Sequence, residues 1–333
     1  MSLILDKINY VYSEGTAYQI QALKDVNLEI RDGQFIGVIG HTGSGKSTLI
    51  QHLNGLVKAT SGTIYFNGQD IYDEDFDLRE LRNRVGLVFQ YPEHQLFETT
   101  IFDDVCFGPK NQGLSKEEAG LRAFEALRSV GLPEELYYQS PFDLSGGQKR
   151  RVVLAKILAG HFDVLLLDEP TNHLDQEMIT WLEEYLRSYR GTVLMVTHDR
   201  YFLDRVTNRI LELSHGKMYG YDADYTGFLE LKAAREEREL ATERKRQSVL
   251  RMELEWAKRG CRARTTKQKA RLERLEELKN GKAPVKDQTV ELDSVETRMG
   301  KKTVELHHVS KAFGEKKILN DFDYNGNMLK NSM

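Results

Sequence analysis

The stretch FIGVIGHTGSGKST occupies residues 35–48 and decides the fold class of this chain. A short apolar run passes directly into a glycine-rich loop that matches the pattern G-x-x-x-x-G-K-[ST], and a helical pattern follows. Small residues let such a loop curl so that successive backbone N–H groups, together with the helix N-terminus, point at phosphates. We therefore predict a phosphate loop formed by Gly40, His41, Thr42, Gly43, Ser44, Gly45, Lys46, Ser47 and Thr48.

Two acidic residues end a second apolar run, VLLLDEP (164–170). Asp168 lies where burial makes a carboxylate costly unless it serves a metal ion. Glu169 follows and is our candidate general base, placed to orient and deprotonate an attacking water. We expect Lys46 to reach the β- and γ-phosphates and Ser47 to ligate Mg²⁺, so these residues predict a site for a magnesium–nucleotide complex.

Two further apolar runs are continuous rather than alternating, VGLVFQ (85–90) and TVLMVTH (192–198). Continuous apolar strands are typical of a parallel sheet that is covered on both faces. Residues 115–131 and 146–160 carry helical patterns between the runs. This alternation predicts an α/β fold.

Three side chains near strands are further candidates, each with a structural alternative. Gln90 suits contact with Mg²⁺ or the attacking water, although an ordinary polar strand end looks the same. His198 either hydrogen-bonds the γ-phosphate, since ligands bind at this end of such strands, or is structural. Tyr12 is either a ring that stacks on adenine or a core aromatic of an N-terminal strand.

A second candidate anion site begins the helix in LSGGQKRR (144–151), at Ser145, Gly146, Gly147 and Gln148. Backbone N–H groups at such a helix start bind anions. One chain cannot easily bring two phosphate-binding helix starts onto the same γ-phosphate. We therefore expect a dimer in which this loop closes on the partner's nucleotide, the partner being a second copy or a related subunit.

These motifs, in this order, resemble the ATP-binding cassette (ABC) ATPases over residues 1 to about 225. The resemblance implies a RecA-like core, a helical subdomain at about 91–160, ATP and Mg²⁺ as cofactors, and head-to-tail dimers with two ATP molecules at the seam. It also implies individual roles: adenine stacking for Tyr12, Walker A for 40–48, the Q-loop for Gln90, the signature for 144–148, Walker B for Asp168 and Glu169, the D-loop for Asp175, and the switch histidine for His198.

The chain resembles two branches of that family. Residues 1 to about 150, including ALKDVNLEI and VGLVFQYPEHQLFETTIFDDVCFGPKNQGLS, resemble the ATPase subunit of energy-coupling factor (ECF) transporters. From about 152 onward, LLLDEPTNHLD and EWAKRGCRARTTKQKARLERLEEL resemble the soluble ABC-F proteins, which act on the ribosome. We interpret the chain as a chimera with its seam near LSGGQKRR, either an artificial fusion or a real gene product.

Each branch implies a different function. In an ECF-type transport ATPase, residues 91–114 would contact a transmembrane partner. In an ABC-F translation factor, a basic hairpin would contact RNA, and seven cations without an intervening acid support this, although a solvated linker is the alternative: Lys258, Arg259, Arg262, Arg264, Lys267, Lys269 and Arg271. A third hypothesis is a non-productive fusion that only binds ATP. We expect no DNA partner.

An internal repeat lies near the C-terminus. Residues 304–325 echo residues 3–30, with Phe313 corresponding to Tyr12 and Asp321 to Asp25. We therefore predict four regions: a cassette at 1–230, a charged helical hairpin at 231–283 (helices at about 230–258 and 263–280, joined near Gly260), a linker at 284–303, and a truncated second cassette at 304–333.

Composition narrows the cellular setting. The 333 residues carry a net charge of −4, and Cys106 and Cys261 are the two cysteines, too few for a disulfide framework. No run of about 18 apolar residues and no secretory signal occur in the sequence. We expect a cytoplasmic protein, with a peripheral position on the cytoplasmic face of the cell membrane as one option.

Overall fold

A computed structural model describes most of the chain. Residues 1–284 and 285–333 form two separate compact units. The described residues are 2–214, 216–258, 273–276, 278, 280, 302–313 and 316–327. None of the helices in these ranges is both long and apolar enough to cross a membrane.

A six-stranded sheet with the order β10-β9-β3-β8-β7-β6 forms the centre of the first unit. Its strands are β3 (Phe35–Ile39), β6 (Val85–Val88), β7 (Val164–Asp168), β8 (Thr192–Val196), β9 (Arg209–Ser214) and β10 (Lys217–Tyr221). All pairs are parallel except β9 with β10. The predicted α/β class is confirmed, and β6, β7 and β8 are buried along their whole length.

A second sheet is antiparallel, with the order β2-β1-β4-β5, and sequence analysis did not predict it. It consists of β1 (Ser2–Tyr12), β2 (Ile20–Arg31), β4 (Ser61–Phe66) and β5 (Gln69–Asp70). Helix α1 (Lys46–Leu53) contributes Leu49 and Leu53 to a core that also contains residues of both sheets. This core fixes the helix that follows the glycine-rich loop.

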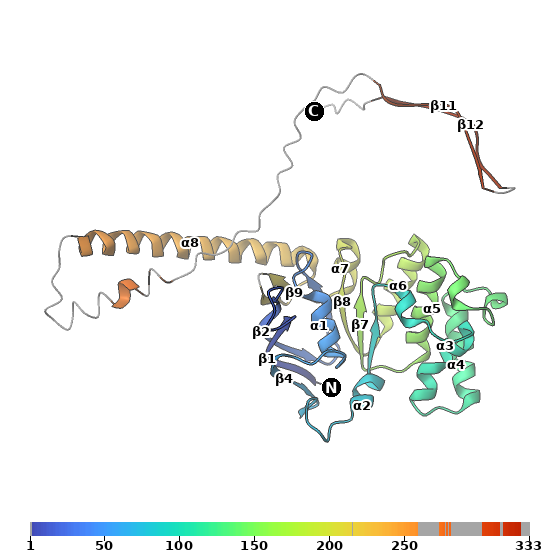
Figure 1. Cartoon of the computed structure of the whole chain (residues 1–333), viewed down its shortest axis with the longest axis horizontal. Coiled ribbons are helices and arrows are strands. Elements are labelled where there is room, and N and C mark those ends of the chain that lie inside the picture. Colours follow the sequence, from blue (N-terminus) through green and yellow to red (C-terminus); the bar gives the residue numbers. More distant parts are fainter. Residues whose placement is uncertain are drawn as a thin grey trace. The chain divides into compact units, whose positions relative to one another are not determined.

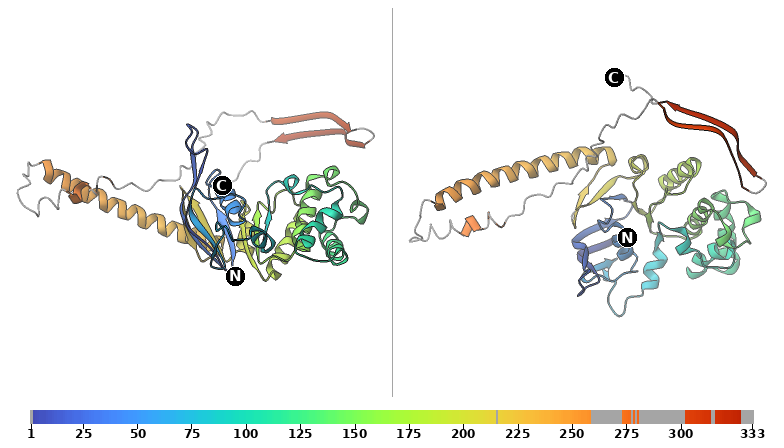
Figure 2. Two further views of the ribbon diagram at one scale, coloured as in Figure 1. Left: turned by 60° about the horizontal axis from the view of Figure 1, so that its bottom comes forward. Right: turned by 45° about the horizontal axis from the view of Figure 1, so that its top comes forward.

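Three helices, α3 (Ile101–Asn111), α4 (Lys116–Ser129) and α5 (Gly146–Ala159), pack on one another on one side of the parallel sheet, and the antiparallel sheet lies on the other side (Figures 1 and 2). Both predicted helices are confirmed as α4 and α5. Capping boxes start each of them, at Ser115 with Glu118 and at Ser145 with Gln148. The remaining short helices are α2 (Leu78–Arg84), α6 (Gln176–Ser188), α7 (Arg200–Val206), and the 3-10 turns η1 (Pro92–Gln95), η2 (Glu134–Leu136) and η3 (Pro141–Asp143).

Helix α8 (Tyr225–Lys258) is 34 residues long and begins about five residues before the predicted start. The earlier start has a packing reason, since Phe228 is buried with its ring centroid 5.1 Å from that of Tyr221 on β10. Of the predicted second helix, residues 273–276, 278 and 280 are described, and they are helical. The side chain of Lys258, the predicted junction near Gly260 and the other six cations lie outside the described part: Arg259, Arg262, Arg264, Lys267, Lys269 and Arg271.

The second unit contains a hairpin of β11 (Lys302–Phe313) and β12 (Lys316–Asn327). Its pairing repeats that of β1 and β2, because Val309 faces Phe322 as Ile8 faces Val26. The ends agree as well, with Phe313 opposite Lys316 and Tyr12 opposite Ile20. The internal repeat predicted from sequence is therefore also a repeat of strand register.

Candidate active site

The predicted phosphate loop connects β3 to α1 and curls around the amine of Lys46. The Nζ atom donates hydrogen bonds to the carbonyls of Gly40 (2.8 Å) and His41 (3.0 Å). Gly45 caps the helix at φ +98°, and a Cβ atom there would lie 2.5 Å from the carbonyl oxygen of Ala22. Only glycine fits that position without moving β2. Burial lowers the pKa of Lys46, opposed by the carboxylates of the acidic pair.

The acidic pair lies beside this loop, at the end of β7. Asp168 is 5% exposed and shares a side-chain hydrogen bond with Ser47. Burial and the neighbouring charge of Glu169 raise the pKa of Asp168, whereas Ser47, Arg150 and Lys46 lower it. A buried carboxylate whose ionised form is disfavoured gains most from a bound cation. Two of the three predicted magnesium ligands, Ser47 and Asp168, thus lie together.

Glu169 adopts an unusual backbone conformation. Its φ is +49°, a left-handed value that costs a non-glycine residue about 1–2 kcal/mol. Its backbone N–H donates to the carbonyl of Val196 (2.7 Å), and its carboxylate accepts from the backbone N–H of His198 (3.3 Å). The His198 Nε2 atom lies 3.5 Å from the Glu169 carboxylate. Two of the three predicted catalytic residues, Glu169 and His198, therefore meet at the ends of β7 and β8.

Tyr12, at the end of β1, contacts the loop, and Gln90 follows β6. The Tyr12 hydroxyl is 2.8 Å from the Thr48 hydroxyl, and the residue is 42% exposed. This contact places an accessible aromatic ring next to the phosphate loop, as adenine stacking requires. Gln90 is half-buried and lies two residues beyond the end of β6.

The helix start within the 144–148 segment lies at the surface. Ser145 and Gly146 are exposed, whereas Lys46 is 9% exposed. The Ser145 side chain caps its own helix, accepting from the Gln148 N–H (3.4 Å) and donating to the Gln148 Oε1 (2.9 Å). Gly147 lies close to the carbonyl of His173, near the predicted D-loop. An exposed helix start is available to a second molecule.

Two residues of α5 that were not among the predicted site residues, Arg150 and Arg151, also contact functional elements. Arg150 is completely buried, and burial lowers its pKa to about 10. Arg151 forms an ion pair with Asp175 (2.7 Å), which caps α6 by accepting from the Met178 N–H. The Met178 and Arg151 hydrogen bonds lower the pKa of Asp175. The helical period places residue 150 on the same face as buried Val153, Leu154 and Ile157, a signal that would have revealed its burial.

The residues present fit a nucleotide with Mg²⁺. The Ser44 hydroxyl, which belongs to the phosphate loop, is buried without a hydrogen-bond partner. Within the described ranges, no cluster of three or more His, Cys, Asp or Glu side chains could hold a metal by itself. That is the expected situation for Mg²⁺, which takes one or two protein carboxylates together with substrate phosphates and water.

Comparisons with known proteins support this assignment. A family model described as "ABC transporter" matches residues 23–172, and a second model with the same description matches residues 211–292. The energy-coupling factor transporter ATP-binding protein EcfA2 of Caldanaerobacter subterraneus subsp. tengcongensis is 49% identical over 222 residues, covering 66% of this chain and 78% of that protein. Its counterpart from Clostridium tetani is 47% identical over 222 residues, covering 65% and 77%.

Solved structures agree. The dimeric, post-hydrolysis ATP-binding cassette MJ0796, bound to ADP and Pi, matches with a TM-score of 0.58 and 31% identity, covering 66% of this chain and 98% of that one. The cbiO1 protein of Clostridium perfringens, part of the ABC transporter complex cbiONQ, matches with a TM-score of 0.57 and 33% identity, covering 73% and 96%. This chain therefore belongs to the ABC transporter ATPases, as a cassette that binds ATP with Mg²⁺, hydrolyses it, and is related over about two thirds of its length to the energy-coupling factor ATP-binding proteins.

Proposed function

We propose that this chain is the ATP-binding subunit of an ECF-type transporter, working on the cytoplasmic face of the membrane. The observation that supports this most directly is 49% identity over 222 residues to an energy-coupling factor ATP-binding protein. In this proposal the cassette pairs with a second cassette, and closure of the pair on ATP drives a transmembrane partner. The dimeric MJ0796 cassette is a precedent for such a pair.

We assign the chemical roles as follows. Lys46 neutralises charge on the β- and γ-phosphates, and Ser47 and Asp168 hold Mg²⁺, which when bound would offset the charge that develops on the transferred phosphoryl group. Glu169 accepts a proton from the attacking water, because its carboxylate is fixed by the His198 backbone N–H. Gln90 orients the water. The partner's copy of the exposed 144–148 segment completes the site.

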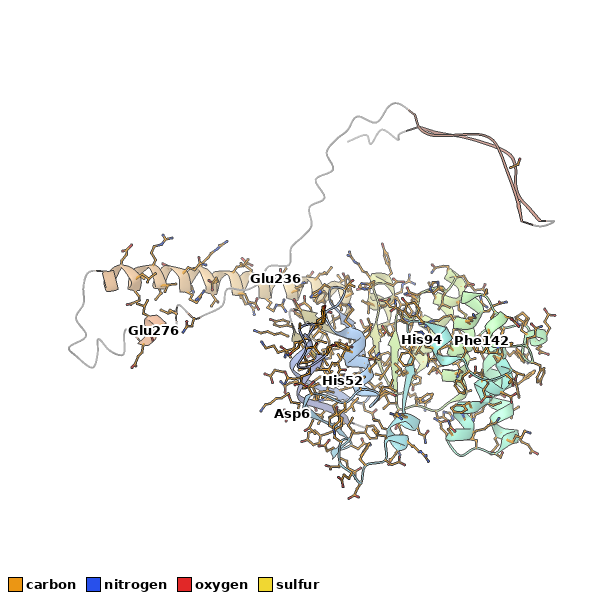
Figure 3. The ribbon with its side chains drawn as sticks, viewed as in Figure 1. Asp6, His52, His94, Phe142, Glu236 and Glu276 are labelled. Carbon is orange, nitrogen blue, oxygen red and sulfur yellow. The ribbon has the colours of Figure 1, made fainter. Side chains whose placement is uncertain are left out.

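The surface that would bind the transmembrane partner is an aromatic patch within 91–114, formed by Phe97 and Phe107, and Tyr91 is exposed in the same segment. Phe97, Phe107 and Tyr91 are 53%, 40% and 51% exposed, and the ring centroids of Phe97 and Phe107 are 4.8 Å apart. Large aromatic side chains clustered on a surface are typical of binding sites for other proteins. Exposed Phe142, labelled in Figure 3, lies in η3 just before the signature.

A vesicle-binding experiment tests the transport role. The chain should bind vesicles that contain the transmembrane subunit of an energy-coupling transporter and not empty vesicles. The double substitution Phe97→Asp and Phe107→Asp should abolish binding while ATP affinity stays unchanged. Leu121→Asp is the matched control, since Leu121 on α4 is 63% exposed and lies outside the patch. Vesicle binding that survives the double substitution would contradict the proposed docking surface.

Hydrolysis is tested separately. Glu169→Gln should retain ATP binding and accumulate a closed dimer with little turnover, because the variant keeps the shape of the base but cannot accept the proton. Light scattering during size-exclusion chromatography with ATP measures the dimer, and phosphate release measures turnover. Turnover at the wild-type rate in this variant would refute the assignment of the base.

The ribosome-associated function remains as a second candidate. It is favoured by the long helix α8, by NHLD at 172–175, and by the cations at 258–271, most of which lie outside the described residues. The relatives described above are transporter proteins, so we rank transport first. Sedimentation with ribosomes that disappears at high salt, without vesicle binding, would reverse this order.

A further inference from the structure

The Arg150 side chain connects three parts of the proposed machinery by donating hydrogen bonds to main-chain carbonyls. Its Nη1 atom donates to the carbonyl of Phe89 (2.6 Å), the residue before Gln90. The Nη2 atom donates to the carbonyls of Asp168 (3.2 Å) and Glu169 (2.7 Å), and Nε donates to the carbonyl of Pro170 (3.4 Å). One buried guanidinium therefore binds both the acid turn and the peptide that precedes Gln90.

Three of these carbonyl acceptors surround a strained backbone position. Glu169 has a left-handed φ of +49°, and such a turn persists only where its surroundings hold it. Arg150 donates to the carbonyl of the strained Glu169 and to the carbonyls of its two neighbours, Asp168 and Pro170. A planar group with five N–H donors can satisfy several carbonyls at fixed angles, which a lysine ammonium cannot reproduce.

Arg150 also belongs to the signature helix. It lies five residues after Ser145, the N-cap of α5, so the helix start and the guanidinium are separated by about 7–8 Å of rigid helix. Under the proposed function, Ser145 contacts the partner's ATP, whereas Glu169 and Gln90 serve the ATP of their own chain. The same side chain therefore joins the groups that act on two different nucleotides.

We propose that Arg150 is a positioning residue that holds the acid turn, the Gln90 loop and the signature helix as one body, so that closure on the partner's ATP and alignment of this chain's own base occur together. This inference rests on the proposed function. Arg150 touches neither nucleotide nor metal in this scheme. Its loss should therefore affect turnover and dimer closure but leave the phosphate loop's affinity for ATP intact.

The test compares Arg150→Lys and Arg150→Met in the full-length chain, with Arg84→Met as control. Arg84 also connects two elements, but through a half-exposed ion pair with Asp163 (3.2 Å). This pair lies at the N-terminal ends of β6 and β7, whereas the acid turn lies at the C-terminal end of β7. We expect kcat to fall about 100-fold in Arg150→Met, because misplacing reacting groups by about 1 Å has that effect. The kcat of Arg150→Lys should lie between those of Arg150→Met and the wild type. In both variants the dissociation constant for MgATP should stay within about twofold of the wild-type value. Arg84→Met should match the wild type in both quantities.

Two further measurements separate positioning from general instability. In the Glu169→Gln background, Arg150→Lys should reduce ATP-driven dimer formation while the number of ATP-binding sites per chain is unchanged. Loss of turnover that only parallels loss of ATP-binding sites in both variants would overturn the proposal, as would wild-type kcat in Arg150→Lys. If the wild-type chain hydrolysed no ATP, the proposed function itself would fail, which is a different result.

Discussion

A buried ion pair beneath the aromatic patch allows a quantitative test of how the docking surface is held. Asp104 on α3 is completely buried, and its Oδ1 atom is 2.5 Å from Nζ of Lys156 on α5. Its Oδ2 atom accepts the backbone N–H of Phe97 (3.1 Å). Lys156 also donates to the carbonyl of Gln95 (2.6 Å) and lies 4.6 Å from the centre of the Phe97 ring. The pair thus connects two helices with the loop that carries Phe97.

Asp104→Ala should destabilise the cassette by about 3–5 kcal/mol, because removing one partner leaves the other charge buried and uncompensated. Removing both charges, with Asp104→Leu and Lys156→Met together, should cost only about 2 kcal/mol, about 1 kcal/mol for each of the hydrogen bonds lost by the Phe97 N–H and the Gln95 carbonyl. Urea unfolding followed by circular dichroism gives both values from the midpoints and slopes.

Asp103→Ala is the matched control for this comparison. Asp103 is adjacent in sequence, half-exposed, and 4.0 Å from Lys110, so its pair should contribute at most about 1 kcal/mol. If Asp104→Ala cost no more than this control, Lys156 would be adequately solvated without its partner. The reasoning that the buried pair holds the docking surface would then be refuted.

Three other predictions concern binding and stability. Lys46→Ala should weaken MgATP binding at least about tenfold in a fluorescent-nucleotide titration, since the loop loses its only ammonium, and unchanged affinity would contradict the phosphate-loop assignment. Tyr12→Leu should weaken ATP binding about tenfold and Tyr12→Phe much less, because ring stacking is worth about 1–3 kcal/mol per base; equal losses would instead indicate the hydrogen bond to Thr48. Glu212→Gln should lower the free energy of unfolding in urea by about 3 kcal/mol, because Glu212 is 3% exposed and paired with Arg235 (3.0 Å). The same substitution should make the start of α8 accessible to limited proteolysis. An unchanged proteolysis pattern would show that apolar packing alone anchors α8.

Local patterns were sufficient to predict the parallel sheet and the order of its motifs. Each central strand is a continuous apolar run, and three functional residues follow such a run within two positions: Gln90 after β6, Glu169 after β7 and His198 after β8. Parallel strands end at one edge, so proximity of these residues followed from fold class. The antiparallel sheet was not predictable in this way, because β1 pairs with both β2 and β4, and the latter lies about fifty residues away.

Buried charges were the other features missing from the sequence analysis. Asp104 and Glu212 occur in stretches that read as ordinary polar positions, whereas the helical period indicates the burial of Arg150 but not its partners. Only the assembled fold shows what surrounds all three. Their partners are distant in sequence or are main-chain carbonyls, neither of which leaves a residue-type signature. The 144–148 motif predicted an anion site at a helix start, but not that the same helix carries a guanidinium beneath it.

The strained turn at Glu169 explains why such a group is needed there. As the proposed base, Glu169 must point its carboxylate toward the nucleotide. Asp168, the last residue of the buried strand β7, also directs its side chain to this site, where it shares a hydrogen bond with Ser47 of the phosphate loop. Two consecutive side chains can face one site only if the backbone turns sharply between them, which the positive φ of Glu169 achieves. Such a turn exposes carbonyls that no strand partner can satisfy, and burying them unpaired would be costly. The Arg150 side chain of α5 donates hydrogen bonds to those carbonyls. The same hydrogen bonds that hold the turn and align the base therefore also connect the helix that begins at Ser145 to the acid turn.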